Sequence, residues 1–457
     1  MMARILFLLV VWFLAAVNTA EAQKRALVSE LNAFIKKYPR TKTVLFLSQT
    51  KATPGDTIRF HASVFDQSGS EYTQRQILNL ELADHNGRIV HRQNVLMASG
   101  SADSYLSIPA GLSEGFYLIR AFTNRMRNFG EDSFTWQTIE VVRDRSLQRS
   151  VSPPFISIHP EGGLLIGGVM NHLAVSYHGV PLGGVIKIIG SVSGELGIAF
   201  AASSGISSLM VRPKAGESIH AAHASDIKSA AIISNTGGVA LFLREKQGNL
   251  RLNFLPRSFS AKDLNVVLLG RGEAKELQLR KDYADSLIYE LPSGALNGYY
   301  QILIFSQDRK IIASRIWSTT VNQPLVTLEL KNVSPALREK SEFLLQLSDR
   351  SGKPLKGTFN FTVTDERAFH GSKYDDHVSL LKRYQGTDPD GWNRKSDQND
   401  LEEITVQEQW IPENWSDPSY NFIHQSQSTL RFSGQLKRSD GLPFTDSTSV
   451  MLFLQKR

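Results

Sequence analysis

The chain has 457 residues, enough for about three domains of ordinary size, so a single small fold is excluded. Its 41% hydrophobic and 21% charged residues are typical of a globular protein, and the absence of cysteine excludes disulfide scaffolds, cysteine-based zinc sites and cysteine nucleophiles. The net charge of +7 is small beside 51 basic and 44 acidic residues and includes no arginine-rich block, so we expect no nucleic-acid partner.

The first 22 residues have the three parts of an export signal. Arg4 supplies a positive charge, an apolar run extends from Ile5 to Val17, and Ala20-Glu21-Ala22 forms a cleavage site of small residues. The apolar run is shorter than the ~20 residues of a membrane-spanning helix, which argues against the alternative of an uncleaved anchor. We therefore predict a signal peptide that is cleaved after Ala22. The mature protein is expected in the periplasm, at the outer membrane or on the cell surface of a bacterium.

Residues 23–40 are predicted to form a short helix and a linker. Leu27, Leu31 and Phe34 recur at the spacing of one helical face, and Pro39 ends the pattern. This short amphipathic stretch is the only helical pattern that we assign, and the sequence beyond it is interpreted as strands.

From residue 41 onward, apolar and polar side chains alternate, as they do between Ile58 and Val64. Such alternation is typical of strands with one buried and one solvated face, and turn-forming Gly, Pro, Asn and Asp residues separate the runs. We predict an all-β fold of tandem antiparallel β-sandwiches after the signal peptide and the short helix. The four expected sandwiches span residues 41–143, 152–223, 226–320 and 324–384.

Over residues 385–425 the composition changes, and Asp, Asn, Gln, Pro and Gly predominate. This predicts a polar loop or linker. Residues 430–457 again read as strands but are too few to close a sandwich, so we expect a partial β domain. Trp392, Trp410 and Trp415 lie in the polar segment and are our candidate partner contacts, because loop aromatics stack on sugar rings or anchor proteins. The alternative is that they pack the loop onto its own domain.

Several ordered motifs resemble a known family. The segment from Phe46 to Phe60, with Pro54-Gly55-Asp56 inside it, and the later Glu114-Gly115-Phe116-Tyr117 resemble the macroglobulin-type (MG2-type) domain of the alpha-2-macroglobulin superfamily. His159-Pro160-Glu161-Gly162-Gly163 resembles the opening of a following domain in bacterial relatives, and Arg315-Ile316-Trp317 the close of the next one.

The end of the chain extends this resemblance. Ser433-Gly434-Gln435-Leu436 with Gly441-Leu442-Pro443 is similar to the first half of a carboxypeptidase-regulatory-like domain. The resemblance implies an array of macroglobulin- or immunoglobulin-like sandwiches at the bacterial envelope. In some relatives such an array continues into a plug like that of TonB-dependent outer-membrane receptors. The superfamily's protease-trapping thioester needs a cysteine, and a chain with no cysteine cannot form it.

We predict no catalytic, metal-binding or cofactor-binding residue and no cofactor. His220, His223 and Asp226 would offer three metal ligands in one helical turn, but no glutamate base lies between the histidines, and an interdomain linker is favoured. Ser225 and Lys228 match Ser-x-x-Lys without the companion motifs of acyl-serine enzymes.

Three further patterns have ordinary explanations. The stretch 190–194 has valine where a nucleophile elbow has serine, which predicts a turn. The acidic stretch near Asp388 and Asp390 lacks the glycine and glutamate spacing of an EF-hand loop. His370 with Asp375, Asp376 and His377 is interpreted as an exposed hydrophilic connection.

We therefore expect a non-catalytic envelope scaffold that binds a protein or polysaccharide partner through sheet edges or interdomain grooves. We expect any association with the outer membrane to occur without a transmembrane helix. We also expect the protein to form the front part of a TonB-receptor-like chain. Two alternatives stay open. One is a protease inhibitor of macroglobulin type that works without a thioester, with residues 385–421 as bait; the other is a carbohydrate-active enzyme or carbohydrate-binding module.

Overall fold

The computed structural model describes residues 26–66, 72–143, 154–244, 249–255, 259–260, 262–291, 298–319, 325–330, 343–348, 352–354 and 410–428. The expected signal peptide, the partial domain at 430–457 and most of the expected fourth sandwich lie outside these ranges. One helix spans residues 26–37, and almost all other regular structure is strand. Within the described ranges, no helix has both the length and the apolarity to cross a membrane.

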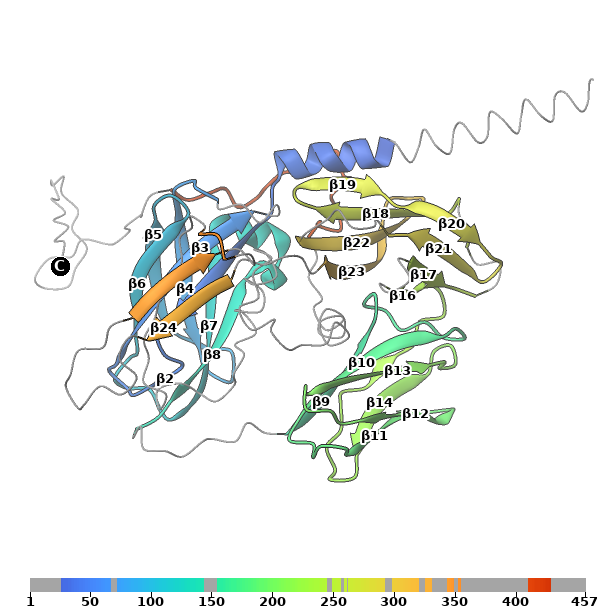
Figure 1. The fold of residues 1–457 in the computed structure, drawn as a ribbon, viewed down its shortest axis with the longest axis horizontal. Helices are drawn as coiled ribbons and strands as arrows, with labels where there is room; N and C mark the ends of the chain where they lie inside the picture. Colours follow the sequence, from blue (N-terminus) through green and yellow to red (C-terminus); the bar gives the residue numbers. More distant parts are fainter. Residues whose placement is uncertain are drawn as a thin grey trace, which may run out of the picture.

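The first sandwich packs a three-stranded sheet, β1-β3-β6, against a five-stranded sheet, β2-β8-β7-β4-β5 (Figure 1). All pairs are antiparallel except β2 with β8. Alternate residues such as Ile58, Phe60 and Ala62 point into the core between the sheets. The elements are β1 (Thr41–Leu47), β2 (Lys51–Ala52), β3 (Thr57–Asp66), β4 (Gln76–Ala83), β5 (Ile89–Met97), β6 (Ser101–Ser107), β7 (Gly115–Thr123), η1 (Asn124–Phe129), η2 (Glu131–Ser133) and β8 (Thr135–Val141).

The second sandwich pairs the sheets β13-β10-β9 and β12-β11-β14-β15 around its own core. The predicted boundary between residues 223 and 226 is wrong, because Ile232–Ile233 forms β15 and pairs with Ser218 and Ile219 of β14. Its strands are β9 (Phe155–Pro160), β10 (Asn171–His178), β11 (Val185–Gly190), β12 (Gly194–Phe200), β13 (Ile206–Val211), β14 (Ser218–His223) and β15 (Ile232–Ile233).

The third sandwich pairs the sheets β16-β17-β21-β20 and β19-β18-β22-β23. Strand β18 is buried on both faces: Val266 and Leu268 point into the sandwich core, while Val267 and Leu269 point outward into a second apolar cluster. Its strands are β16 (Ala240–Arg244), β17 (Asn249–Asn253), β18 (Leu264–Gly270), β19 (Glu273–Glu276), β20 (Gln278–Asp282), β21 (Ser286–Glu290), β22 (Gly298–Ser306) and β23 (Ile311–Thr319).

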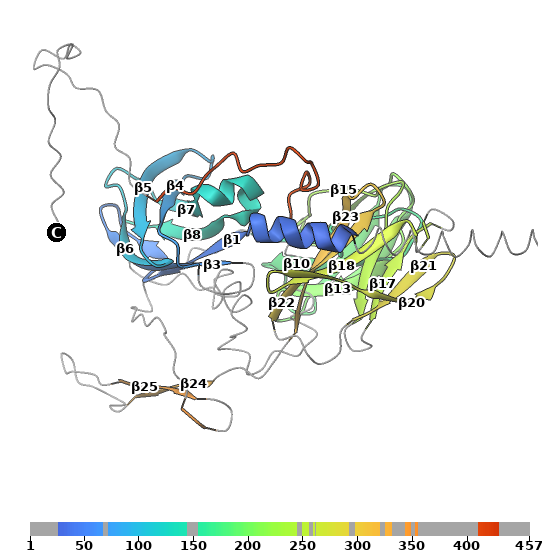
Figure 2. The ribbon, with the colours of Figure 1, turned by 90° about the horizontal axis from the view of Figure 1, so that it is seen from above.

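Two strands follow the third sandwich: β24 (Leu325–Leu330) and β25 (Phe343–Ser348) form an antiparallel pair. The helix 26–37 lies between the first and third sandwiches, and residues 410–428 run from one to the other (Figure 2). The helix buries Leu27, Leu31 and Phe34, as its periodicity predicts. The prediction of an all-β fold of tandem antiparallel sandwiches is thus confirmed.

Candidate functional site

Exposed apolar side chains gather on the second sandwich. Of the 14 large hydrophobic side chains that are exposed among the described residues, ten lie between residues 155 and 233. They are Phe155, Leu164, Met170, Leu182, Val185, Val192, Ile198, Phe200, Met210 and Ile233. Contiguous exposed apolar surface in a soluble protein marks a contact site more often than isolated residues do. The second sandwich is therefore the first place to seek a partner surface.

Four of these residues share the outer face of one sheet. Val185 of β11 lies opposite Phe200 of β12, and Ile198 lies two residues from Phe200 on the same face. Across the sheet, Ile233 of β15 lies opposite Ser218 of β14. Their exposed fractions are 39% for Val185, 41% for Ile198, 63% for Phe200 and 69% for Ile233. We call these four residues the second-sandwich apolar face.

The alternation of β11 decides which of its side chains lie on this outer face. Ile186 and Ile188 are fully buried in the core, so Val185 and Lys187 must point outward. Strand β12 is also the last strand of its sheet in the described structure, with β11 on one side only. An edge strand leaves backbone N–H and C=O groups that a partner strand can pair. An apolar face beside an open edge suits an extended protein segment.

The predicted tryptophan contacts need correction. Trp410 is 1% exposed and Trp415 is 4% exposed, because both pack into the apolar cluster between the helix and the outer face of the third sandwich. Side chains buried in this way cannot stack on a sugar or anchor a separate protein. The alternative interpretation, packing onto the chain's own domains, fits both residues. Trp392 lies outside the described residues.

The described end of the polar segment, residues 410–425, makes more contacts than its composition suggests. Residues 410–425 have no helix or strand, as expected, but bury Ile411 and Phe422 together with the two tryptophans. In this part of the expected bait, up to residue 421, three buried anchors, Trp410, Ile411 and Trp415, are separated by exposed residues such as Glu413, Asn414 and Asp417. The bait alternative stays a prediction. Residues 385–409 lie outside the described ranges.

The histidine motif does not form a helical ligand cluster. His220 and His223 lie on strand β14, where an odd spacing places them on opposite faces of the sheet. The interdomain linker expected here is likewise wrong, because β14 pairs with β11 inside the second sandwich. Ser225 bonds only locally, with its Oγ 2.6 Å from His223 Nδ1 in an exposed turn. The described residues contain no group of three or more possible metal ligands of the His, Asp or Glu type.

The turn at residues 190–194 is confirmed, and a buried carboxylate holds it. Glu217 Oε1 accepts hydrogen bonds from the N–H groups of Val192 (2.9 Å) and Ser193, and Oε2 accepts one from the Lys214 N–H (2.7 Å) and one from the Ser193 hydroxyl (2.9 Å). Burial alone would raise the pKa of Glu217, but these hydrogen bonds stabilise the carboxylate and lower its pKa to about 2. Glu217 is therefore a structural anion.

A second buried carboxylate joins the second sandwich to the third. Glu161, directly after β9, has its side chain fully buried, and its Oε1 lies 2.8 Å from Nε of Arg315 on β23. The same oxygen accepts the Leu243 N–H of β16 at 3.0 Å, and Oε2 lies 2.7 Å from Nδ1 of His172 on β10. Residues from both sandwiches thus converge on one carboxylate.

The glycine after Glu161 allows this close approach. Gly162 has φ of +87°, and a Cβ there would come within 2.9 Å of Leu241 Cβ in β16. Its carbonyl accepts the Ser314 N–H of β23 at 3.3 Å. The motifs containing Glu161 and Arg315, which the sequence offers only as resemblances, therefore meet in space. Sequence reasoning misses this junction because nothing local pairs the two charges.

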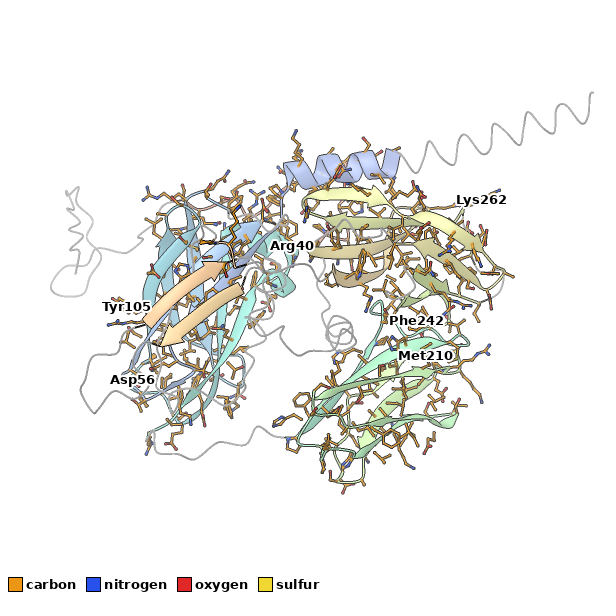
Figure 3. All side chains as sticks on the ribbon, viewed as in Figure 1. Arg40, Asp56, Tyr105, Met210, Phe242 and Lys262 are labelled. Atoms are coloured by element: carbon orange, nitrogen blue, oxygen red, sulfur yellow. The ribbon has the colours of Figure 1, made fainter. Side chains whose placement is uncertain are left out.

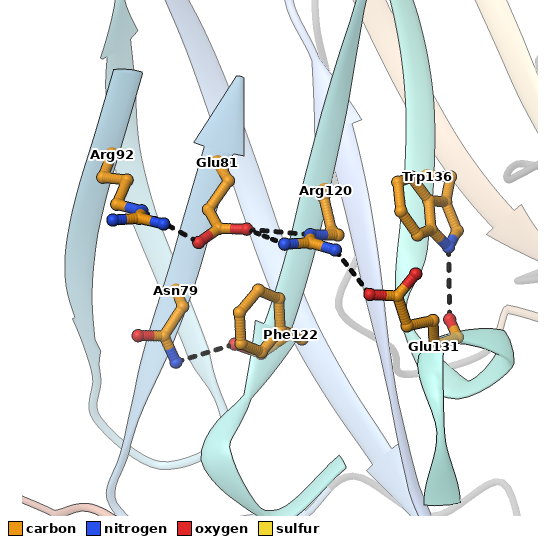
Figure 4. A network of polar contacts seen from close by, with 7 residues as sticks. All are labelled: Asn79, Glu81, Arg92, Arg120, Phe122, Glu131 and Trp136. Carbon is orange, nitrogen blue, oxygen red and sulfur yellow. Dashed lines mark hydrogen bonds and ion pairs between the residues drawn. The ribbon is translucent and has the colours of Figure 1, made fainter. Parts of the chain in front are cut away.

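The outer face of the first sandwich carries a ladder of charges across the strands β5, β4 and β7 and the short helix η2 (Figure 4). Arg120 of β7 donates to Glu81 of β4 and to Glu131 of η2, and Arg92 of β5 donates to Glu81 at 3.1 Å. The Arg120 guanidinium also lies 5.5 Å from the ring centre of Trp136. Because each carboxylate already accepts from an arginine, the ladder is a structural ion network on the surface of the sheet.

No protein-family model and no curated protein matches the chain. Among solved structures, it is similar to alpha-2-macroglobulin from Salmonella reacted with methylamine (11% identity, TM-score 0.20, covering 67% of this chain and 25% of that one). It is also similar to Escherichia coli alpha-2-macroglobulin activated by porcine elastase (11% identity, TM-score 0.25, covering 70% and 34%). A third is the BSP domain of a biofilm-associated protein (19% identity, TM-score 0.17, covering 42% and 30%).

The chain therefore spans a quarter to a third of the length of these structures. The chain's own sheets enclose three separate apolar cores, one in each sandwich. The chain is a tandem array of antiparallel β-sandwiches.

Proposed function

We propose that the protein is a non-catalytic scaffold exported to the bacterial envelope, and that it binds a partner protein through the second-sandwich apolar face. The observation that carries the proposal is the position of Phe200 and Ile198, both exposed, on an edge strand whose neighbour presents Val185 on the same face. The Phe200 carbonyl already accepts the Ser207 hydroxyl, so a partner strand would pair with β12 before Phe200 and bury these side chains.

The chemistry of the face favours a protein over a polysaccharide. Three of its four side chains, those of Val185, Ile198 and Ile233, are aliphatic, and aliphatic groups bury well against apolar protein side chains. Sugar rings instead stack on flat aromatic rings between hydrogen-bonding groups. The resemblance of the first sandwich to macroglobulin-type domains supports a role in protein contact at the envelope.

Photocrosslinking in living cells tests the proposal. A photoreactive phenylalanine analogue at Phe200 is expected to crosslink one defined envelope protein in fractionated cells. The matched control places the analogue at Tyr105, which is 56% exposed on the first sandwich. Crosslinks of equal pattern at both positions, no protein crosslink at position 200, or capture of polysaccharide there would contradict the proposal.

Export makes a separate prediction. When the full chain is expressed with its own leader in a Gram-negative bacterium, we expect the mature protein in the periplasmic or outer-membrane fraction with Gln23 as its first residue. Intact-mass measurement and N-terminal sequencing of the purified protein check this. Recovery from the cytoplasm with the first 22 residues retained would contradict the export part of the proposal.

A further inference from the structure

Residues 410–428, which we call the strap, pack against three other parts of the molecule. The strap has turns but no helix or strand, yet it buries four large apolar side chains. They are Trp410, Ile411, Trp415 and Phe422. A segment without regular structure that buries this much apolar surface is held by its seat and not by its own backbone ladder.

The first part of the seat is the outward face of the third sandwich. Val267, Leu269, Leu303 and Phe305, from β18 and β22, join the same apolar cluster as the tryptophans. The ring centres of Phe305 and Trp415 lie 5.8 Å apart. The Trp410 N–H donates to Oε1 of Gln301, a fully buried side chain of β22, at 3.1 Å.

The helix forms the second part of the seat. Phe34 lies 6.0 Å from Trp415 and 5.0 Å from Tyr420 between ring centres, and Tyr38 lies 4.8 Å from Phe422. The Tyr38 hydroxyl donates to the Tyr420 carbonyl at 2.9 Å. The middle of the strap is thus covered by aromatic side chains at the C-terminal end of the helix.

The last part of the strap is bound to the first sandwich by its backbone. The Ile77 N–H of β4 donates to the Gln427 carbonyl at 2.8 Å, and Asn124 Nδ2 donates to the Gln425 carbonyl at 2.7 Å. Asn128 pairs with the His424 backbone in both directions, at 2.7 and 2.9 Å. Because these bonds use the strap's backbone, they hold its position without depending on its side chains.

Neither sandwich needs the strap to close its own core. The core clusters of the first and third sandwiches contain no residue of the strap or of the helix. The strap therefore joins two bodies that are each already complete, and its departure removes its own contacts but not theirs. A segment that can leave without opening either core can exist in two states, seated and withdrawn.

We propose that the strap is a detachable brace. Seated, it fixes the first sandwich to the third through the helix. Withdrawn, it uncovers Phe305 on the outward face of the third sandwich and the sides of Phe34 and Tyr38 that it covers, and frees the two sandwiches to move. The seat then accepts a segment with the chemistry of the strap itself: two tryptophans spaced by four residues, followed by aromatic side chains.

Distance measurements between the two sandwiches test the brace. Tyr105 and Lys262 are exposed on the first and third sandwiches (Figure 3), and a chain without cysteine allows both to be replaced by cysteine and spin-labelled without background labelling. We expect one narrow distance distribution in the otherwise unchanged chain. The double substitution W410A and W415A is expected to broaden it at least twofold, while the sandwiches keep their circular dichroism and cooperative unfolding.

Two controls make the result specific. Ile423→Ala removes an apolar side chain of the same strap that is 87% exposed, and it should leave the distribution narrow. The conservative pair W410F and W415F should restore most of the narrow distribution. A narrow distribution in the double alanine variant would overturn the brace, and loss of sandwich folding in that variant would show that the strap is not detachable.

A peptide experiment tests the open seat. A fluorescent peptide with the sequence of residues 410–428 is expected to bind the W410A and W415A variant at least tenfold more tightly than the otherwise unchanged chain, whose seat is filled. The same peptide with both tryptophans replaced by alanine should not bind. Equal binding to both proteins, or no binding to the variant, would overturn the proposal that the seat accepts such a segment.

Discussion

Replacing Glu161 by alanine is expected to destabilise the second and third sandwiches by about 3–5 kcal/mol, because Arg315 and His172 would lose the carboxylate between them. The Arg315 side chain is only 3% exposed, so water cannot replace the lost partner. The free energy of unfolding, from urea titrations followed by circular dichroism and tryptophan fluorescence, measures the loss. Glu161→Gln keeps the volume of the side chain. It should also lower the free energy of unfolding, since the amide is neutral.

The matched control for Glu161 is Glu195→Ala. Glu195 pairs with Lys187 on the surface of the same sandwich, where the two side chains are 46% and 52% exposed. A surface pair of this kind is worth about 0–1 kcal/mol, so the control should unfold almost as the unchanged protein does. If Glu161→Ala cost no more than Glu195→Ala, the carboxylate junction between the two sandwiches would not be the structural element that we describe.

Replacing Glu217 by glutamine is expected to cost about 2–4 kcal/mol and to remove one acid-sensitive component of stability. The amide has one acceptor oxygen where the carboxylate has two, so its NH₂ group must face the N–H of Lys214 or those of Val192 and Ser193. Leaving buried donors unsatisfied costs about 1–3 kcal/mol each. Urea unfolding at pH 7 measures this loss directly.

The acid dependence follows from the sign of the pKa shift. The pKa of Glu217 falls from 4.5 to about 2 on folding, so the unfolded state takes up the proton first as the pH is lowered. The stabilisation is complete above about pH 4.5 and is lost as the pH falls towards 2. The difference in unfolding free energy between the unchanged protein and Glu217→Gln should therefore shrink over this interval. A difference that does not change with pH would contradict the account, and Glu195→Gln should show little pH-dependent difference.

Local pattern was sufficient for the fold class. Alternation along β3, with Ile58, Phe60 and Ala62 inside, depends on one strand only, and one strand is visible in a short window of sequence. The apolar stripe of the helix could be predicted from the sequence in the same way. Its packing against Val267 and Leu303 could not, because these residues are far from the helix in the chain. The unbroken apolar run of β18 is the signal that this strand is buried on both faces.

The errors have the same physical origin. His220 and His223 have the spacing of neighbours on a helix, and only the strand conformation of β14 separates them. Composition identified residues 410–425 correctly as irregular. It did not identify their few buried apolar side chains, among them Trp410 and Trp415. The apolar face of the second sandwich was invisible because exposure depends on what the rest of the molecule leaves uncovered.

The affinity of the crosslinked partner for purified protein tests the proposed function most directly. Phe200→Asp places a charge on the proposed contact and should weaken binding at least tenfold, which is about 1.4 kcal/mol or more. Tyr105→Asp, on the first sandwich, should leave the affinity unchanged. Equal affinities for Phe200→Asp and the unchanged protein would show that the second-sandwich apolar face is not where the partner binds.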